Sequence, residues 1–299
     1  MAAWKLGPAL ACGNTVVIKA AEQTPLSILY LASLIKEAGF PAGVVNVVNG
    51  PGATVGAAMA LHLDIDKIAF TGSTNTGKAI MKAAAANLKT ITLETGGKSP
   101  LLVFEDANLD QAVKWSHVGI MSNMGQICTS TSRIYVHESI YEKFVEQFKK
   151  YTIENSVVGN QFDTKVNHGP QVSAAQKKRI LGYLETGKRE GAQLVLGEDQ
   201  PSADAKGYFV NPIIFKDTTR GMAPVREEVF GPFVVIQSFK DEQDAIEKAN
   251  DTEYGLGAAL FSENITRAHK VASAIQAGMV WVSTHQHSCL VLIMRSANP

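Results

Sequence analysis

The sequence of 299 residues has only three cysteines, Cys12, Cys128 and Cys289, and they lie far apart. An odd number of widely spaced cysteines, without a CxxC pair or a neighbouring histidine cluster, argues against a disulfide framework and against a zinc site. We therefore expect no bound metal and a reducing compartment, which points to the cytoplasm.

The sequence also lacks an excess of charge of either sign and any long apolar run. Lys plus Arg and Asp plus Glu number 28 each, so the formal net charge is zero and no basic stripe for nucleic acid stands out. The apolar run CLVLIM (289–294) is far shorter than a membrane span. The beginning, MAAWKLGPAL, has neither a secretory nor an arginine-rich targeting pattern. We therefore expect no nucleic-acid partner and no membrane partner.

Short β-branched runs alternate with amphipathic stretches from residue 14 to about residue 103. The stretch 24–41 carries a full helix signature, with Thr24 as N-cap, Pro25 at the first helical position and Gly39 as the stop. Strand-like runs lie at 14–19, 44–50, 66–73 and 90–97, and further helices at 53–62 and 76–88. Apolar strands separated by single helices predict a parallel sheet covered on both faces, which is the doubly wound α/β architecture.

After residue 100 the pattern loosens into a second α/β unit. Its expected strands are 100–106, 132–139, 208–215, 233–239, 257–262 and 278–283, and its expected helices are 109–123, 139–154, 173–190, 241–250 and 265–276. No repeat or low-complexity linker separates the two units, so we place the boundary from the pattern alone. The expected domains are 1–96 and 97–282.

Glycine-bearing turns follow strands at two places in the first unit. NGPGATVG (49–56) has a GxGxxxG spacing between a strand and a helix, which is a near-match to a dinucleotide fingerprint and equally typical of a tight turn. TGSTNTG (71–77) offers hydroxyl groups and backbone N–H groups at a helix N-terminus, where an anion is stabilised; alternatively, its Ser and Thr residues only cap the helix. Both turns are candidates for a phosphate contact.

Lys19 and Glu22 follow directly after a strand, at the edge of a parallel sheet where ligands bind. A carboxylate there can accept both ribose hydroxyls and repel a 2′-phosphate, so Glu22 favours NAD over NADP. The alternative is a solvated charge pair in a loop.

Further along the chain, the carboxylate of Glu94 and the thiol of Cys128 are candidate catalytic groups. Glu94 stands at a strand end before two glycines in TLETGGKSP (92–100), and Cys128 lies in the polar run NMGQICTSTSR (123–133). If the two side chains meet, a thiolate can attack an electrophilic carbon and the carboxylate can activate water to release the product. The spacing alone does not bring them together, and a single loop cysteine is more often structural.

Several separate motifs resemble, in order and spacing, the NAD(P)-dependent aldehyde dehydrogenase superfamily, and its broad-specificity class most of all. They are AWKLGPALACGNTVVIKAAEQTPLS (3–27), FTGSTNTG (70–77), TLETGGKSP (92–100), GQICTSTSR (125–133) and REEVFGPF (226–233). The resemblance runs from residue 1 to about Val282. It implies an incomplete NAD-binding domain followed by a catalytic α/β domain.

The resemblance also implies roles for residues. Cys128 is implied as the nucleophile and Glu94 as the general base that releases a carboxylic acid from a cysteine thioester after hydride transfer to NAD. The implied cofactor residues, from the adenosine ribose to the nicotinamide, are Lys19, Glu22, Gly52, Gly72, Ser73, Gly77, Glu228 and Phe230. By the same resemblance, the GxGxxxG stretch becomes an adenine-side turn and does not grip phosphate.

The two ends depart from the family pattern. Family members carry a Pro-Trp-Asn motif before this region, whose asparagine donates to the oxyanion; losing such a donor costs roughly 10² to 10³ in rate. Residues 283–299 do not match the family continuation, so we expect a divergent, unstructured tail in which His285 and His287 bind no metal. Family homo-oligomer contacts are expected to be lost. Within the motifs, Ala20 and Thr95 replace a usual proline and leucine, and TSTS (129–132) replaces an Ala/Gly-bearing run.

The sequence therefore predicts an incomplete enzyme that oxidises a small-molecule aldehyde with NAD. Two alternatives remain. The chain is a catalytically inactive, cofactor-binding fragment, or it is a cysteine hydrolase or thioester-forming acyltransferase.

Overall fold

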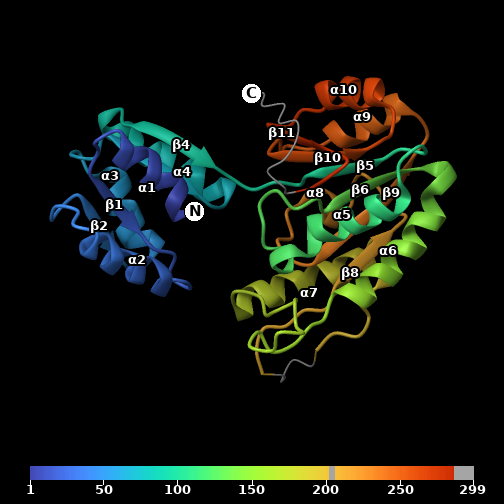
Figure 1. Cartoon of the computed structure of the whole chain (residues 1–299), viewed down its shortest axis with the longest axis horizontal. Helices are drawn as coiled ribbons and strands as arrows, with labels where there is room; N and C mark the ends of the chain where they lie inside the picture. Colours follow the sequence, from blue (N-terminus) through green and yellow to red (C-terminus); the bar gives the residue numbers. More distant parts are fainter. Residues whose placement is uncertain (202–205, 286–299) are drawn as a thin grey trace. The chain divides into compact units, whose positions relative to one another are not determined.

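The computed structural model describes residues 1–201 and 206–285, and the chain forms two compact units that divide between Thr95 and Gly96 (Figure 1). Both units alternate strands with helices, which confirms the predicted α/β class. Among the described residues, no helix is both long enough and apolar enough to cross a membrane.

The first unit contains parallel strand pairs. Its strands are β1 (Val16–Lys19), β2 (Val45–Val48), β3 (Lys67–Thr71) and β4 (Thr90–Glu94), and its helices are α1 (Ala2–Ala11), α2 (Leu26–Glu37), α3 (Ala57–Leu61) and α4 (Thr74–Ala84), with short turns η1 (Gly52–Gly56) and η2 (Ala85–Asn87). β1 pairs in parallel with β2, and β3 in parallel with β4. The predicted single sheet therefore consists of two two-stranded sheets, because no hydrogen-bonded ladder joins β1 to β3.

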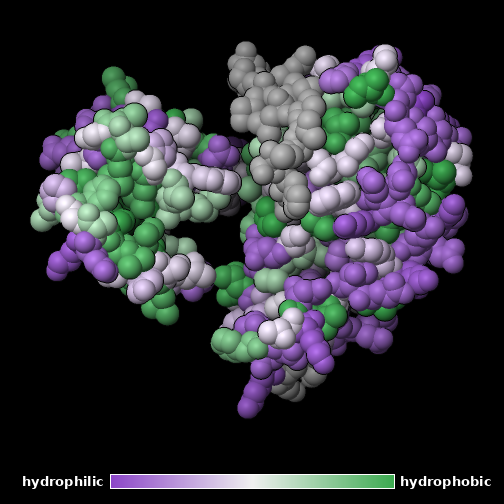
Figure 2. All heavy atoms as spheres, in the orientation of Figure 1, coloured by the Kyte–Doolittle hydropathy of each residue, from purple (hydrophilic) through white to green (hydrophobic). Residues whose placement is uncertain are grey.

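Apolar side chains of the first unit remain largely on its surface (Figure 2). Trp4 is 71% exposed and Tyr30 is 68% exposed. The buried apolar residues of its described part are Leu6, Ala20, Ala60 and Ala84. Since burial of apolar area is the main source of folding free energy, this unit has little core of its own.

The second unit is built on one seven-stranded sheet in the order β11-β10-β5-β6-β9-β8-β7. The strands are β5 (Pro100–Val103), β6 (Arg133–His137), β7 (Gln193–Leu196), β8 (Ile213–Lys216), β9 (Phe233–Phe239), β10 (Gly257–Phe261) and β11 (Met279–Val282). All neighbours are parallel except β7, which runs antiparallel to β8 at the edge.

Helices cover both faces of this sheet. They are α5 (Leu109–Met121), α6 (Tyr141–Asn155), α7 (Ala174–Arg189), α8 (Ala223–Arg226), α9 (Glu242–Asn250) and α10 (Ile265–Ala274), with short turns η3 (Ser122–Gly125) and η4 (Glu138–Ile140). Leu101 packs in the cluster with α5 and α6, whereas Leu102 packs in the cluster with α9 and α10. Neighbouring strand residues point to opposite faces, so the continuous apolar run of β5 fills both layers.

Side-chain caps explain where most helices of the second unit begin. Asn108, Ser173, Asp241 and Asn264 each accept a backbone N–H from the first turn of the helix that follows. The expected cap of α2 differs, because Pro25 occupies the N-cap position and the helix starts at Leu26. Helix boundaries commonly shift by one or two residues in this way.

The expected unstructured tail begins with ordered residues. His285 is fully buried and its ring lies 4.6 Å from that of Trp281, so this residue belongs to the packed second unit. His287 and Cys289 lie outside the described residues. The sequence pattern also missed β7 and α1, and the strand expected at 208–215 is shorter in the structure, at Ile213–Lys216.

Candidate active site

Cys128 lies in the loop between η3 and β6, with its residue partly exposed. Helix α5 ends at Met121, because Ser122 leaves the helical conformation with φ of −54° and ψ of 138°. Asn123, Met124 and Gly125 then adopt left-handed backbone angles, with φ of 48°, 55° and 69°. At Gly125 a side chain would overlap the carbonyl of Gly231. A glycine is required there both by its backbone angle and by this close approach.

The cysteine loop is fixed to α5 by backbone contacts. Thr131 N–H donates to the carbonyl of Gly119 at 3.1 Å, and Ser130 N–H donates to that of Ile127 at 3.0 Å. The Thr131 hydroxyl occupies the space that a side chain at residue 119 would need. The Thr-Ser-Thr-Ser run at 129–132, which replaces the Ala/Gly-bearing run of the family, therefore fits because Gly119 on α5 leaves room for the Thr131 hydroxyl.

Gly96 and Gly97 bring the cysteine loop and Glu228 together. The Gly97 N–H donates to Oε1 of Glu228 at 3.1 Å. A side chain at Gly97 would overlap the carbonyl oxygen of Cys128, and one at Gly96 would overlap the Glu228 carboxylate. The sequence predicted a turn here that other segments approach closely. In the structure this turn contacts both Cys128 and Glu228, for which the family resemblance implies roles.

The carboxyl group of Glu228 lies in a partly buried, charged environment. Burial raises the pKa of Glu228, and the Gly97 N–H, the Arg179 guanidinium and the Lys98 ammonium oppose this shift. Lys98 is fully buried, and burial together with Arg133 lowers its pKa to about 7, while Glu228 and Glu227 act in the opposite direction. The sequence pattern did not single out Lys98, which lies two residues before the apolar strand β5.

In the first unit, Lys19, Glu22 and Gly52 lie together. The Lys19 ammonium is 3.9 Å from Oε1 of Glu22, and the same oxygen accepts the backbone N–H of Gly52. These residues come from the carboxyl ends of β1 and β2, where ligands of parallel sheets bind. The structure therefore groups the residues predicted for the adenosine side of a cofactor.

Gly72, Ser73 and Gly77 lie at the start of α4. Ser73 is the N-cap of this helix, and its Oγ accepts the backbone N–H of Thr76 at 3.2 Å. Ser73 therefore caps the helix, as one of the two interpretations of this turn predicted. The N-terminus of α4 still attracts an anion, because its backbone dipole and free N–H groups favour negative charge. The Gly72 N–H donates to the carbonyl of Glu94 at 3.1 Å, which places this turn beside the end of β4.

Glu94 is exposed at the end of β4, opposite Thr71 in the parallel register. Lys5 of α1 donates to Thr71 Oγ1 at 2.7 Å. Burial lowers the pKa of Lys5, and the charge of Glu94 opposes that shift. The sequence pattern did not single out Lys5 either, because it did not predict the helix α1 that carries this residue.

The predicted site residues therefore form two groups. Glu94 and the adenosine-side residues belong to the first unit, whereas Cys128, Glu228 and Phe230 belong to the second. Among the described residues, no group of three or more His, Cys, Asp or Glu side chains is arranged to hold a metal ion.

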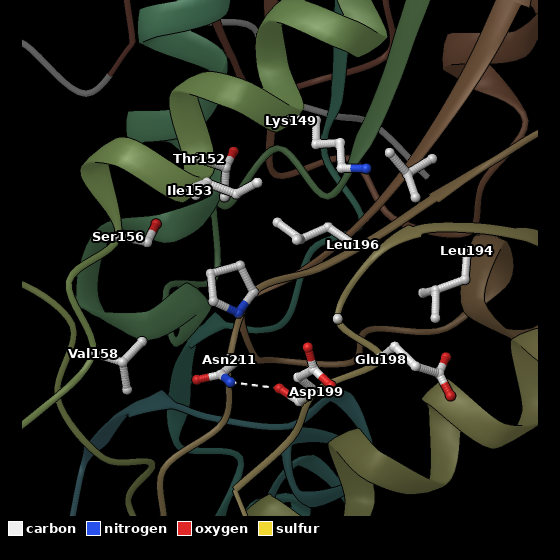
Figure 3. Close-up of a pocket in the computed structure, with 13 residues that line it drawn as sticks. Lys149, Thr152, Ile153, Ser156, Val158, Leu194, Leu196, Glu198, Asp199 and Asn211 are labelled. Carbon is white, nitrogen blue, oxygen red and sulfur yellow. Dashed lines mark hydrogen bonds between the residues drawn. The ribbon is translucent and has the colours of Figure 1, made fainter.

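A cavity of about 520 Å³ lies elsewhere in the second unit (Figure 3). It is bordered by the end of α6 and by β7, and both carboxylates and aliphatic side chains line it. Neither Cys128 nor Glu228 is among its lining residues. Its size alone therefore does not make it the site of the cysteine chemistry.

Comparison with known proteins decides the family. The sequence model of the "Aldehyde dehydrogenase family" matches residues 1–291. The chain belongs to the aldehyde dehydrogenase family. This confirms the resemblance drawn from the motifs.

Individual aldehyde dehydrogenases agree with this membership. A putative aldehyde dehydrogenase-like protein of Schizosaccharomyces pombe is 56% identical over 288 residues, which are 96% of this chain and 58% of that protein. Cytosolic aldehyde dehydrogenase 1 of Mus musculus is 52% identical over 287 residues, covering 94% of this chain and 56% of its own length. The chain thus spans less than three fifths of the relatives it matches.

Solved aldehyde dehydrogenase structures share the fold. The NAD+ complex of the Bacillus cereus enzyme is 48% identical with a TM-score of 0.93, covering 96% of this chain and 58% of that one. Betaine aldehyde dehydrogenase from Staphylococcus aureus in complex with NAD+ is 39% identical with a TM-score of 0.93, covering 96% and 57%. Both agree with the predicted α/β fold.

Proposed function

We propose that this chain oxidises an aldehyde to a carboxylic acid with NAD, using Cys128 as nucleophile and Glu94 as general base. The observation that carries the proposal is the Gly96–Gly97 turn, which packs the Cys128 backbone against the residue that holds Glu228. The backbone of Cys128 and the carboxylate of Glu228 thus contact the same turn, which supports the roles proposed for these two residues. The first unit is proposed as the NAD-binding domain and the second as the catalytic domain.

The chemistry of the chain follows from these groups. The Cys128 thiolate adds to the carbonyl carbon, and the carbonyl oxygen takes up the negative charge. Bound NAD would supply the hydride acceptor for that carbon, and Cys128 would then carry the acyl group as a thioester. Glu94 then removes a proton from water as the water attacks the thioester; the acid leaves and the thiolate is restored.

Residues in both units are suited to hold NAD. Glu22 and Lys19 are proposed to bind the adenosine ribose and Gly52 to line the adenine side, and the carboxylate of Glu22 disfavours the 2′-phosphate of NADP. The N-terminus of α4, with Gly72, Ser73 and Gly77, is proposed to face the pyrophosphate. Glu228 and Phe230 are proposed to contact the nicotinamide ribose and ring. Solved relatives in complex with NAD+ support this choice of cofactor.

A second candidate is a catalytically inactive fragment that still binds NAD. It is favoured by the small core of the first unit. We also propose a cytoplasmic location, since a relative from mouse is named as cytosolic.

The test compares the unaltered chain with Cys128→Ala and with Cys12→Ala, whose cysteine is exposed in the first unit. NADH formation from a simple aldehyde is expected for the unaltered chain and for Cys12→Ala and is expected to disappear in Cys128→Ala, with NAD binding kept in all three. NAD binding without NADH formation in any of them would instead select the inactive fragment. Hydrolysis of an activated ester without NAD reduction would select the cysteine hydrolase.

A further inference from the structure

The loop 227–231, which carries Glu228 and Phe230, contacts α7 residue by residue. Gln176 Nε2 donates to the carbonyl of Val229 at 3.0 Å and to that of Phe230 at 2.8 Å. The Arg179 guanidinium donates to the carbonyl of Glu228 at 2.7 Å. Residues three or four apart on a helix share a face, so one face of α7 supplies these donors.

The same face of α7 continues towards the C-terminal end of the helix, with Ile180 and Tyr183. The Tyr183 hydroxyl donates to the carboxylate of Glu227. Ile180, which is fully buried, occupies the space that a side chain at Gly231 would need. Every residue from 227 to 231 is therefore touched by α7, through polar groups at one end and apolar packing at the other.

The backbone of Phe230 needs such support. Its φ is 60°, a left-handed angle that is an outlier for a bulky aromatic residue. Such conformations persist only where the surroundings over-determine them. The two hydrogen bonds from Gln176 fall on the carbonyls of Val229 and Phe230, on either side of the strained φ angle.

The segment just before α7 holds the cysteine loop as well. Val172 N–H donates to Oε1 of Gln126 at 3.0 Å, and Gln171 Nε2 lies 3.4 Å from the carbonyl of Met124. Gly231 packs its carbonyl against Gly125 of the same loop. Helix α7 and the segment just before it thus contact both loops that carry the proposed site of this unit.

We propose that α7 is the positioning helix of the loop 227–231, with Gln176 and Arg179 as the positioning residues that set the cofactor contacts of Glu228 and Phe230. This inference rests on the proposed function. Neither residue is required to touch the cofactor, because both act on backbone carbonyls of the loop. Loss of either donor frees the loop while the helix and the sheet stay folded.

The experiment uses the full chain and the variants Gln176→Met and Arg179→Met, which keep side-chain length and remove the donors. Lys178→Met is the matched control, since Lys178 lies between them in sequence and is exposed. The first measurement is cleavage by an endoprotease specific for glutamate, after Glu227 and Glu228. Cleavage after Glu263, exposed between β10 and α10, is the internal reference.

We expect cleavage at Glu227 and Glu228 to become about tenfold faster in Gln176→Met and Arg179→Met, since each loses about one to two net hydrogen bonds. The same variants should bind NAD about tenfold more weakly, with an unchanged thermal unfolding midpoint. Arg179→Lys should recover much of both properties, and Lys178→Met should behave as the unaltered chain.

Unchanged cleavage in both donor variants would overturn the proposed role of α7. Faster cleavage with unchanged NAD affinity would overturn its link to the cofactor. If the unaltered chain binds no NAD, the proposed function fails together with that link, while the cleavage rates still decide whether α7 positions the loop.

Discussion

The Gly97 N–H donates to the Glu228 carboxylate at 3.1 Å, and the α-carbon of the same glycine lies against the carbonyl of Cys128. One residue thus joins the proposed nucleophile loop to the proposed ribose ligand. Because both neighbours sit at fixed places in the second unit, residue 97 has no room for any side chain.

Gly97→Ala is therefore expected to lower the free energy of unfolding by about 1–3 kcal/mol, the usual range for forced overpacking, and to abolish NADH formation. Gly182→Ala is the control, because its new methyl group would meet nothing within 4 Å on α7. That change should raise stability by about 0.5–1 kcal/mol through helix propensity. Urea unfolding of both variants checks this, and an equally stable Gly97→Ala would contradict the close packing.

The free energy of unfolding should depend on pH because the buried Lys98 changes its protonation on unfolding. Burial lowers its pKa to about 7 in the folded chain, against 10.5 for an ordinary lysine. Between these values the unfolded chain binds more protons, so the contribution of Lys98 to the free energy of unfolding rises with pH. Below pH 7 both states hold the proton, and the contribution stays at its minimum.

Urea unfolding at several pH values between 6 and about 9 should show this rise in the unaltered chain and a smaller rise in Lys98→Met. Lys178→Met, at an exposed lysine, should keep the full rise. A pH profile that is the same with and without Lys98 would show that the ammonium does not titrate in this range.

Among the polar residues of the second unit for which variants are proposed, we expect substitution of Arg133 to lower the free energy of unfolding the most. It is 1% exposed, and its guanidinium donates to buried and partly buried acceptors near the end of α9, before β5 and on β6. The acceptors are the carbonyls of Lys98, Lys248, Ala249 and Asp251 and the hydroxyl of Tyr135.

Arg133→Met removes the guanidinium donors from these acceptors, of which the Asp251 carbonyl keeps a hydrogen bond from Arg226 at 2.9 Å. The change should lower the free energy of unfolding by about 3 kcal/mol or more. Arg133→Lys should recover less than half of the loss, because an ammonium cannot reproduce the planar fork of donors. Chemical denaturation followed by circular dichroism measures both. Full recovery by lysine would indicate that charge matters and fork geometry does not.

Glu22 should control the choice of cofactor. Its carboxylate lies beside Lys19 and accepts the Gly52 N–H, at the carboxyl end of β1. Glu22→Gln removes the negative charge that would repel a 2′-phosphate, so NAD affinity should fall about tenfold and the preference over NADP should narrow. Titration with each cofactor measures this, with Glu37→Gln, on the exposed end of α2, as the control.

Local sequence signals predicted most helices and strands, because periodicity and capping act within a few residues. The continuous apolar run of β5 and the alternation of strands with helices were sufficient for the parallel α/β class. The edge strand β7 was missed, since it is short and bulged and runs antiparallel to its neighbour. The burial of His285 was missed because its partner, Trp281, is recognised only once β11 is packed.

The sequence by itself determined the family, the order of the motifs and the identity of Cys128, Glu94 and Glu228 as candidates. Only the tertiary structure decided that Gly97 meets Glu228, 131 residues away, and that α7 holds the loop around Phe230. It also decided that Lys98 is buried with a lowered pKa. These features depend on contacts between distant segments and on exclusion of water, and neither leaves a periodic pattern in the chain.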